Sequence, residues 1–198
     1  MGNRYLEGNF APVHEEVTAV DLSVTGTIPD WLDGRYLRNG PNPTNTDPAT
    51  YHWFTGHGMV HGVDLRGGNA QWYRNRYVRS AQVASELGEE WKSGPVHAEM
   101  DFASNTNVIG HAGRTFAIVE AGARPVELGY ELETLQRSDL DGTLPNGYTA
   151  HPKRDPESGE LFACSYHWAV PGLQYTVIDR DGRVRKLETI DVADGPMV

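Results

Sequence analysis

The sequence lacks several features that would assign it to common protein classes. Its 198 residues include one cysteine, Cys164, so an intramolecular disulfide is excluded and a reducing compartment is expected. No run approaches the roughly 18 apolar residues of a membrane-spanning helix. The first residues, MGNRYLEGNFAP, contain no apolar core of signal-peptide length. We therefore expect a cytoplasmic protein.

Positive charge is also scarce. The chain has 17 Lys and Arg against 27 Asp and Glu, which gives a net charge of -10. Nucleic acids are bound by basic surfaces, so a nucleic-acid partner is excluded. Nothing in the composition indicates an obligate protein partner.

Glycine, proline and aromatic residues are abundant, and their distribution predicts an all-β protein. The 22 glycines and 12 prolines separate short runs rich in apolar residues, as in sheets joined by tight turns. The pattern favours a sandwich, a barrel or a propeller. Three hairpins are expected: Met59–Leu65 with Ala70–Ser80, Asn107–Gly110 with Thr115–Glu120, and Leu173–Asp179 with Val184–Val192.

Other segments give weaker signals. Phe10–Val24 is expected to be extended and to serve as an edge or closing strand, and Ile28–Leu32 is expected to form one helical turn. A strand over Gly34–Asn39 should stop at the following Gly-Pro-Asn-Pro. The stretch Ser85–Met100 interrupts the hairpins, as a loop or as a short helix around Glu86–Trp91.

A single histidine, His151, stands between two stiff turns. Asn146-Gly147 favours a tight turn with positive φ, and Pro152 biases His151 away from helix. A second turn, Asp155–Gly159, leads into a strand over Leu161–Tyr166. Such flanks fix an imidazole as a ligand or a base requires. The alternative is a histidine that only hydrogen-bonds within its turn.

A second histidine group follows the spacing His-x4-His-x3-His. It consists of His52, His57 and His61, and by spacing alone it is the best metal cluster of the chain. However, Gly56 and Gly58 argue against the helix that would align these imidazoles. No such pattern surrounds His14, His97, His111 or His167, for which surface or core positions are expected.

Arginines and aromatic residues in the first half also allow two readings. The arginines could bind an anion, but structural ion pairing is favoured because acidic residues are abundant; they are Arg35, Arg38, Arg74, Arg76 and Arg79. Trp53, Phe54 and Trp72 could line a substrate tunnel or belong to the core.

Five stretches of this sequence occur in the same order in a known protein family. They are IPDWLDGRYLRNGPNP (Ile28–Pro43), YHWFTGHGMVHGVDL (Tyr51–Leu65) with WYRNRYVRS (Trp72–Ser80), NTNVIGHAGRTFAIVEAG (Asn105–Gly122) and TAHPKRDPESGEL (Thr149–Leu161). The sequence resembles the N-terminal portion of the carotenoid cleavage oxygenase family, particularly its bacterial members. The resemblance covers most of the chain between Ile28 and Tyr166.

The resemblance implies a seven-bladed β-propeller with iron on its axis. A four-stranded blade takes about 40–45 residues, so 198 residues make roughly four blades and the propeller is incomplete in this chain. We expect residues 1–198 to be the N-terminal part of one propeller domain. In the family a second iron-binding histidine follows a segment like Asp194–Val198. The chain should therefore hold one of four histidine ligands.

Three positions carry the implied chemistry. The resemblance assigns His151 as a ligand of one iron(II) ion, and places Thr106 near the open coordination position for dioxygen. Glu120 matches a carboxylate that hydrogen-bonds a ligand histidine, here expected to lie outside this chain. The alternatives are a turn-forming hydroxyl for Thr106 and an exposed strand-end carboxylate for Glu120. His61 falls in a structural Gly-Met-x-His-Gly element, and His57 departs from the aspartate expected there.

The implied reaction is oxidative cleavage of a conjugated carbon–carbon double bond with dioxygen, which yields aldehyde or ketone products. Stilbene-cleaving relatives carry a lysine where Val119 stands and a tyrosine that Gly94–Ser104 lacks, so a carotenoid or apocarotenoid is favoured. An apolar polyene substrate further implies peripheral contact with membranes for its uptake. The alternatives are a stilbenoid-cleaving dioxygenase and a metal-free propeller scaffold or inactive fragment.

Overall fold

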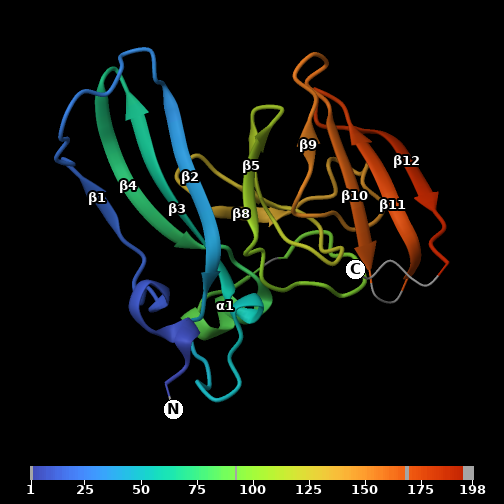
Figure 1. Cartoon of the computed structure of the whole chain (residues 1–198), viewed down its shortest axis with the longest axis horizontal. Coiled ribbons are helices and arrows are strands. Elements are labelled where there is room, and N and C mark those ends of the chain that lie inside the picture. Colours follow the sequence, from blue (N-terminus) through green and yellow to red (C-terminus); the bar gives the residue numbers. More distant parts are fainter. Residues whose placement is uncertain (1, 92, 168–169, 194–198) are drawn as a thin grey trace.

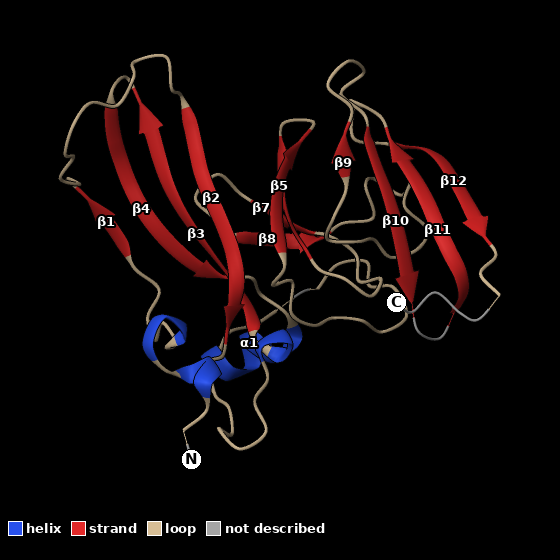
Figure 2. Ribbon diagram, in the orientation of Figure 1, coloured by secondary structure: helices blue, strands red, loops and turns tan. Residues whose placement is uncertain are grey.

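The computed structural model describes residues 2–91, 93–167 and 170–193, and these form three four-stranded antiparallel sheets (Figures 1 and 2). The strand orders are β1-β4-β3-β2, β5-β6-β7-β8 and β12-β11-β10-β9. In Figure 1, the strands of the three sheets nearest the middle of the view are the edge strands β2, β5 and β9. The segment Asp194–Val198, which was expected to precede a second ligand, lies outside the described residues.

The first sheet is a meander closed by an N-terminal strand. Its strands are β1 (Thr18–Val20), β2 (Gly34–Asn42), β3 (His57–Arg66) and β4 (Asn69–Tyr77). β3 and β4 form the first expected hairpin, turning through Gly67 and Gly68 at positive φ. β1 pairs with β4 at the outer edge, which confirms the closing strand expected in Phe10–Val24.

The second and third sheets are hairpin meanders. Their strands are β5 (Asn107–His111), β6 (Arg114–Ile118), β7 (Val126–Leu128), β8 (Thr134–Arg137), β9 (Lys153–Arg154), β10 (Leu161–His167), β11 (Val170–Ile178) and β12 (Val184–Ile190). The pairs β5–β6 and β11–β12 are the other two expected hairpins, and both are confirmed.

Helical structure is confined to short pieces. The helix α1 (Ala81–Leu87) starts earlier than expected, because the Ser80 side chain caps the Val83 N–H and Gly88 ends the helix at a φ of 71°. Three 3₁₀ turns are η1 (Arg4–Leu6), η2 (Gly8–Phe10) and η3 (Trp53–Thr55). No helix among residues 2–91, 93–167 and 170–193 has the length and apolar character needed to cross a membrane.

Two further local expectations were wrong. β2 continues through Pro41 to Asn42, because β2 is an edge strand and pairs only with β3, so a missing N–H can face away from the ladder. The segment Ile28–Leu32 makes a turn, closed by a hydrogen bond from the Leu32 N–H to the Pro29 carbonyl at 3.0 Å, and no helix.

Apolar layers lie between neighbouring sheets. Val60 and Trp72 of the first sheet pack with Val126 and Leu128 of the second. A second layer joins the second and third sheets through Phe116, Ile118, Leu140, Leu161 and Ile178. Burying side chains of this size contributes about 1.5–3 kcal/mol each. The sheets therefore stack face to face, as the blades of a propeller do.

Candidate functional site

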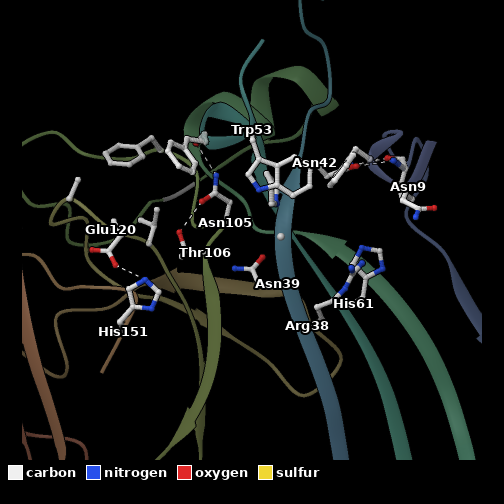
Figure 3. Close-up of a pocket in the computed structure, with 18 of the residues that line it drawn as sticks. Asn9, Arg38, Asn39, Asn42, Trp53, His61, Asn105, Thr106, Glu120 and His151 are labelled. Carbon is white, nitrogen blue, oxygen red and sulfur yellow. Dashed lines mark hydrogen bonds and ion pairs between the residues drawn. The ribbon is translucent and has the colours of Figure 1, made fainter. Parts of the chain in front are cut away.

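His151 lies between the second and third sheets, just before β9. Its backbone is held by the Asn107 side chain, whose Nδ2 donates to the Ala150 carbonyl at 2.9 Å. The imidazole is 64% exposed and its Nε2 lies 2.9 Å from Oε1 of Glu120. Figure 3 shows this pair on one side of a cavity. The imidazole is thus oriented by a carboxylate while its ring stays accessible.

Glu120 follows the end of β6 and is partly buried. Its second oxygen, Oε2, accepts a hydrogen bond from the Thr149 hydroxyl at 3.3 Å. Within this chain the histidine that contacts Glu120 is His151, and the expected histidine partner outside the chain stays a prediction. The chain reversal at Ala121 and Gly122, both at positive φ, returns the backbone beside the 146–151 segment.

Thr106 precedes β5 and faces the same cavity. Its hydroxyl donates to Oδ1 of Asn105 at 3.1 Å, and Asn105 Nδ2 in turn donates to the carbonyls of Gly56 (2.6 Å) and Phe54 (3.1 Å). The Asn105 amide is buried, so these bonds hold the turn before β5 against the loop before β3. Thr106 itself is exposed and lines the cavity.

The cavity that joins these residues has a volume of about 740 Å³. Most of its wall is apolar, with aromatic rings from Phe10, Trp53, Phe54, Phe102 and Tyr166. Trp53 and Phe54 therefore lie at the cavity, whereas Trp72 belongs to the core between the first two sheets. The volume and the aromatic lining suit an apolar molecule.

The His-x4-His-x3-His group does not converge on one point. His52 Nδ1 accepts from the Phe54 N–H at 3.3 Å, while His61 Nδ1 lies 2.9 Å from the Tyr73 hydroxyl. His57 faces Glu86 of α1 at 3.5 Å. Burial lowers the pKa of His57, and burial together with the charge of Arg38 lowers the pKa of His61.

Within the described ranges, no three or more His, Cys, Asp or Glu side chains gather as a metal ion would require. His151 and Glu120 together supply an imidazole and a carboxylate, which is too few donors for a stable site. This chain therefore offers part of a donor set, one accessible imidazole with a carboxylate beside it.

Most arginines of the first half serve the structure, as expected. Arg79 pairs with Glu16 and with Glu89 at 2.8 Å, and Arg74 pairs with Glu131. The others with partners bond to backbone and hydroxyl oxygens: Arg35 to Gly129, Tyr130 and Thr115, and Arg76 to Val17, Asn75 and Thr18. Arg38 differs, because it lines the cavity.

Sequence reasoning missed one cavity residue, Asn39, and the hydrogen-bond network behind it. Asn39 on β2 donates from Nδ2 to the carbonyls of Ser104 (2.6 Å) and Asn107 (3.0 Å), which ties the first sheet to the second. Its Oδ1 is buried without a hydrogen-bond partner in the described part of the chain. The signal available was the Arg38-Asn39 pair inside the family-like motif that ends in Pro43.

Fold and site together define an all-β, propeller-type protein with an imidazole and a carboxylate at an aromatic cavity. Comparisons then identify the family. The family model described as retinal pigment epithelial membrane protein matches residues 10–198. A carotenoid cleavage oxygenase of Mycobacterium tuberculosis is 57% identical over 99% of this chain and 40% of its own length. The carotenoid 9,10(9',10')-cleavage dioxygenase 1 of Arabidopsis thaliana is 34% identical over 98% of this chain and 41% of its own.

Solved structures give the same answer. The lignostilbene dioxygenase of Pseudomonas brassicacearum superposes with a TM-score of 0.82 at 29% identity, over 98% of this chain and 44% of that one. Cobalt-substituted apocarotenoid oxygenase of Synechocystis gives 0.75 at 25% identity, over 91% and 43%. The chain belongs to the carotenoid cleavage oxygenase family and forms part of an all-β propeller. It spans about 40% of the length of the curated relatives it matches.

Proposed function

We propose that this chain is part of a non-haem iron(II) dioxygenase that cleaves a conjugated double bond of a carotenoid or apocarotenoid. Dioxygen would be the co-substrate, and two aldehyde or ketone products would form. The observation that carries the proposal is that His151, Glu120 and Thr106 all open onto one aromatic cavity. The names of the relatives support the reaction class.

In this proposal the chain contributes one of four histidine ligands. When bound, iron would supply the oxygen chemistry, and His151 is the residue of this chain that would hold it. Glu120 would orient the imidazole, since a carboxylate partner fixes ring orientation and raises basicity. The remaining donors would lie beyond this chain, because the relatives extend well past the matched portion. Alone, residues 1–198 would be inactive.

Each part of the wall has a role in such a reaction. The aromatic rings would hold the conjugated chain and keep water from it, which is the protein's share in chemistry carried by a cofactor. Thr106 would face the open side where dioxygen arrives. Phe10 and Phe54 at the cavity are 50% and 80% exposed, which supports a peripheral membrane contact through which a cytoplasmic enzyme takes up an apolar substrate.

A stilbenoid is the second candidate substrate. The similarity to the lignostilbene dioxygenase favours it. Against it, Val119 lines the cavity. The family resemblance places there, in stilbene-cleaving relatives, a lysine that supports phenol recognition. We therefore retain a carotenoid or apocarotenoid as the proposed substrate.

The experiment is iron analysis of a protein that continues past Val198 to the length of the relatives. His151→Ala should lose iron or hold it loosely after gel filtration, and apocarotenal cleavage should disappear with it. The matched control is His57→Ala, which should keep stoichiometric iron because His57 faces Glu86 away from the cavity. Full iron and turnover in His151→Ala would disprove the assignment, and loss of both in His57→Ala would move the site there.

A further inference from the structure

Arg38 occupies the cavity at a distance from the His151–Glu120 pair. It lies on β2 directly opposite His61 of β3, and both residues line the same cavity. Figure 3 shows Arg38 and His61 on the other side of the view from Glu120 and His151. An elongated molecule bound along the cavity would therefore meet His151 and Arg38 at different points of its length.

The guanidinium of Arg38 forms no hydrogen bond or ion pair with any residue that the structure describes. Glu120 is the acidic residue of the cavity wall, and its oxygens are engaged by His151 and Thr149. Arg38 is exposed at this mostly apolar cavity, in a chain whose net charge is -10. Arginine carries five hydrogen-bond donors and no acceptor, so a ligand group that binds Arg38 must be an acceptor, ideally an anion.

The residues around Arg38 support this role. Asn39, its neighbour on β2, is bonded to the Ser104 and Asn107 carbonyls, so the strand that carries Arg38 is held in place. His61 is kept by the Tyr73 hydroxyl, and its pKa is lowered first by burial and then by Arg38. Because His61 is then neutral, Arg38 is the positively charged member of this pair at the cavity.

We propose that Arg38 binds a carboxylate at one end of the conjugated substrate, so that the cavity prefers polyene carboxylic acids to neutral polyenes of the same length. This rests on the proposed function and names the substrate class more narrowly. The planar guanidinium matches a carboxylate with two parallel hydrogen bonds. The aromatic side chains of the cavity would contact the conjugated part of the substrate. Arg38, by binding the carboxylate, would fix how far the substrate enters the cavity.

The test measures ligand binding to a protein of the relatives' length, which is the form expected to be monodisperse, so it does not depend on turnover. The probes are all-trans-retinoic acid and its methyl ester, which differ by the charge of the end group. Quenching of tryptophan fluorescence, to which Trp53 at the cavity contributes, gives both dissociation constants. The wild type should bind the acid about tenfold more tightly, as a partly exposed charge-assisted pair allows.

Arg38→Met should abolish this preference and leave binding of the ester unchanged, and Arg38→Lys should keep part of it. Arg180→Met is the control, since it removes the same charge from a turn outside the cavity and should keep the preference. Thermal melting should be unchanged in all three variants.

Three outcomes overturn the inference: equal wild-type affinity for acid and ester, equal weakening of both in Arg38→Met, or loss of preference in Arg180→Met. If the protein binds the acid and the ester equally tightly, the proposed function stands and this inference fails. If neither probe binds, both the inference and the polyene substrate are contradicted.

Discussion

At the scale of single residues, the cavity brings together side chains that are distant in the sequence. Thr106, Glu120 and His151 follow or precede different strands. Side chains of neighbouring residues hold the backbone beside Thr106 and His151, and Glu120 contacts His151 directly. Asn107 holds the backbone at Ala150, and Asn105 anchors the turn that carries Thr106. Variants of the neighbours should therefore disturb the site nearly as much as variants of the site itself.

Glu120→Gln tests the carboxylate that touches His151. The change keeps the size of the side chain but removes its charge, so the contact with Nε2 at 2.9 Å becomes weaker. In a protein of the relatives' length, we expect iron affinity or activity to fall by roughly 10–100-fold, the usual effect of losing a ligand's hydrogen-bond partner. Metal titration and loss of polyene absorbance measure the two effects. The control is Glu160→Gln, which alters a carboxylate paired with Arg185 outside the cavity. Unchanged iron affinity in Glu120→Gln would contradict the orienting role.

At the scale of elements, turns lock neighbouring sheets together. His111, at the β5–β6 turn, is buried; its Nε2 lies 2.7 Å from the Asp179 carbonyl and its Nδ1 lies 3.1 Å from Arg154 Nη1. A carbonyl needs a donor and a guanidinium needs an acceptor, so these partners select the neutral tautomer with a proton on Nε2. Sequence spacing offered no sign of this role.

This contact makes stability depend on pH. Burial lowers the pKa of His111, and the charge of Arg154 lowers it further. The unfolded chain binds the proton near pH 6.5 and the folded chain only below that, so the stabilisation is complete above about 6.5 and is lost as the pH falls. We expect the free energy of unfolding in urea to be lower at pH 5.5 than at pH 7.5, with a smaller difference in His111→Gln. His14→Gln, at an exposed position, should keep the wild-type difference. If His111→Gln shows the same difference in unfolding free energy between the two pH values as the wild type, His111 is not a source of the pH dependence.

Gly147 joins the His151 segment to the loop after β6. Its φ is not in the positive region, contrary to the tight turn expected for Asn146-Gly147; a Cβ there would overlap the carbonyl of Gly122. The glycine is needed for this close approach, which the Tyr148 N–H to Ala123 carbonyl bond at 3.1 Å continues.

Gly147→Ala should lower the free energy of unfolding by about 1–3 kcal/mol, as overpacking does. It should also separate His151 from Glu120. Gly110→Ala is the matched control, because the nearest atom to a Cβ there is 4.0 Å away and its φ is not positive. Denaturant unfolding measures the stability of both variants. Equal free energies of unfolding would show that the close approach of Gly147 to Gly122 does not require glycine.

At the scale of the whole molecule, the three sheets leave strand edges and large apolar side chains exposed. Tyr36 on β2 is 68% exposed, Val20 on β1 is 61% exposed and Ile190 on β12 is 46% exposed. The outer strands β1 and β12 are edges of their sheets. Open edges and exposed apolar side chains favour association between copies.

Residues 1–198 alone should therefore be oligomeric or poorly soluble. Light scattering after size-exclusion chromatography measures this, with a protein of the relatives' length as the comparison, which should be monodisperse. A monomeric 198-residue chain that melts cooperatively would instead indicate a self-sufficient β domain.

The strand pattern, the turns and the ordered family-like motifs could be read from the sequence, because hydrophobic alternation and turn chemistry act over a few residues. That is why the three hairpins and the edge strand were available without coordinates, whereas the grouping of His151, Glu120 and Thr106 as candidates came from the resemblance to the family. The roles of these three residues at a metal remain predictions.

Tertiary structure decided the rest, since it depends on which distant backbones approach each other. Pro41 continues β2 because that strand is an edge, and Gly147 is needed for contact with Gly122 rather than for a turn. Glu120 meets His151 because the loops after β6 and before β9 lie side by side, and Arg38 faces the cavity because β2 borders β5. Such contacts between residues far apart in the chain leave no trace in local sequence periodicity.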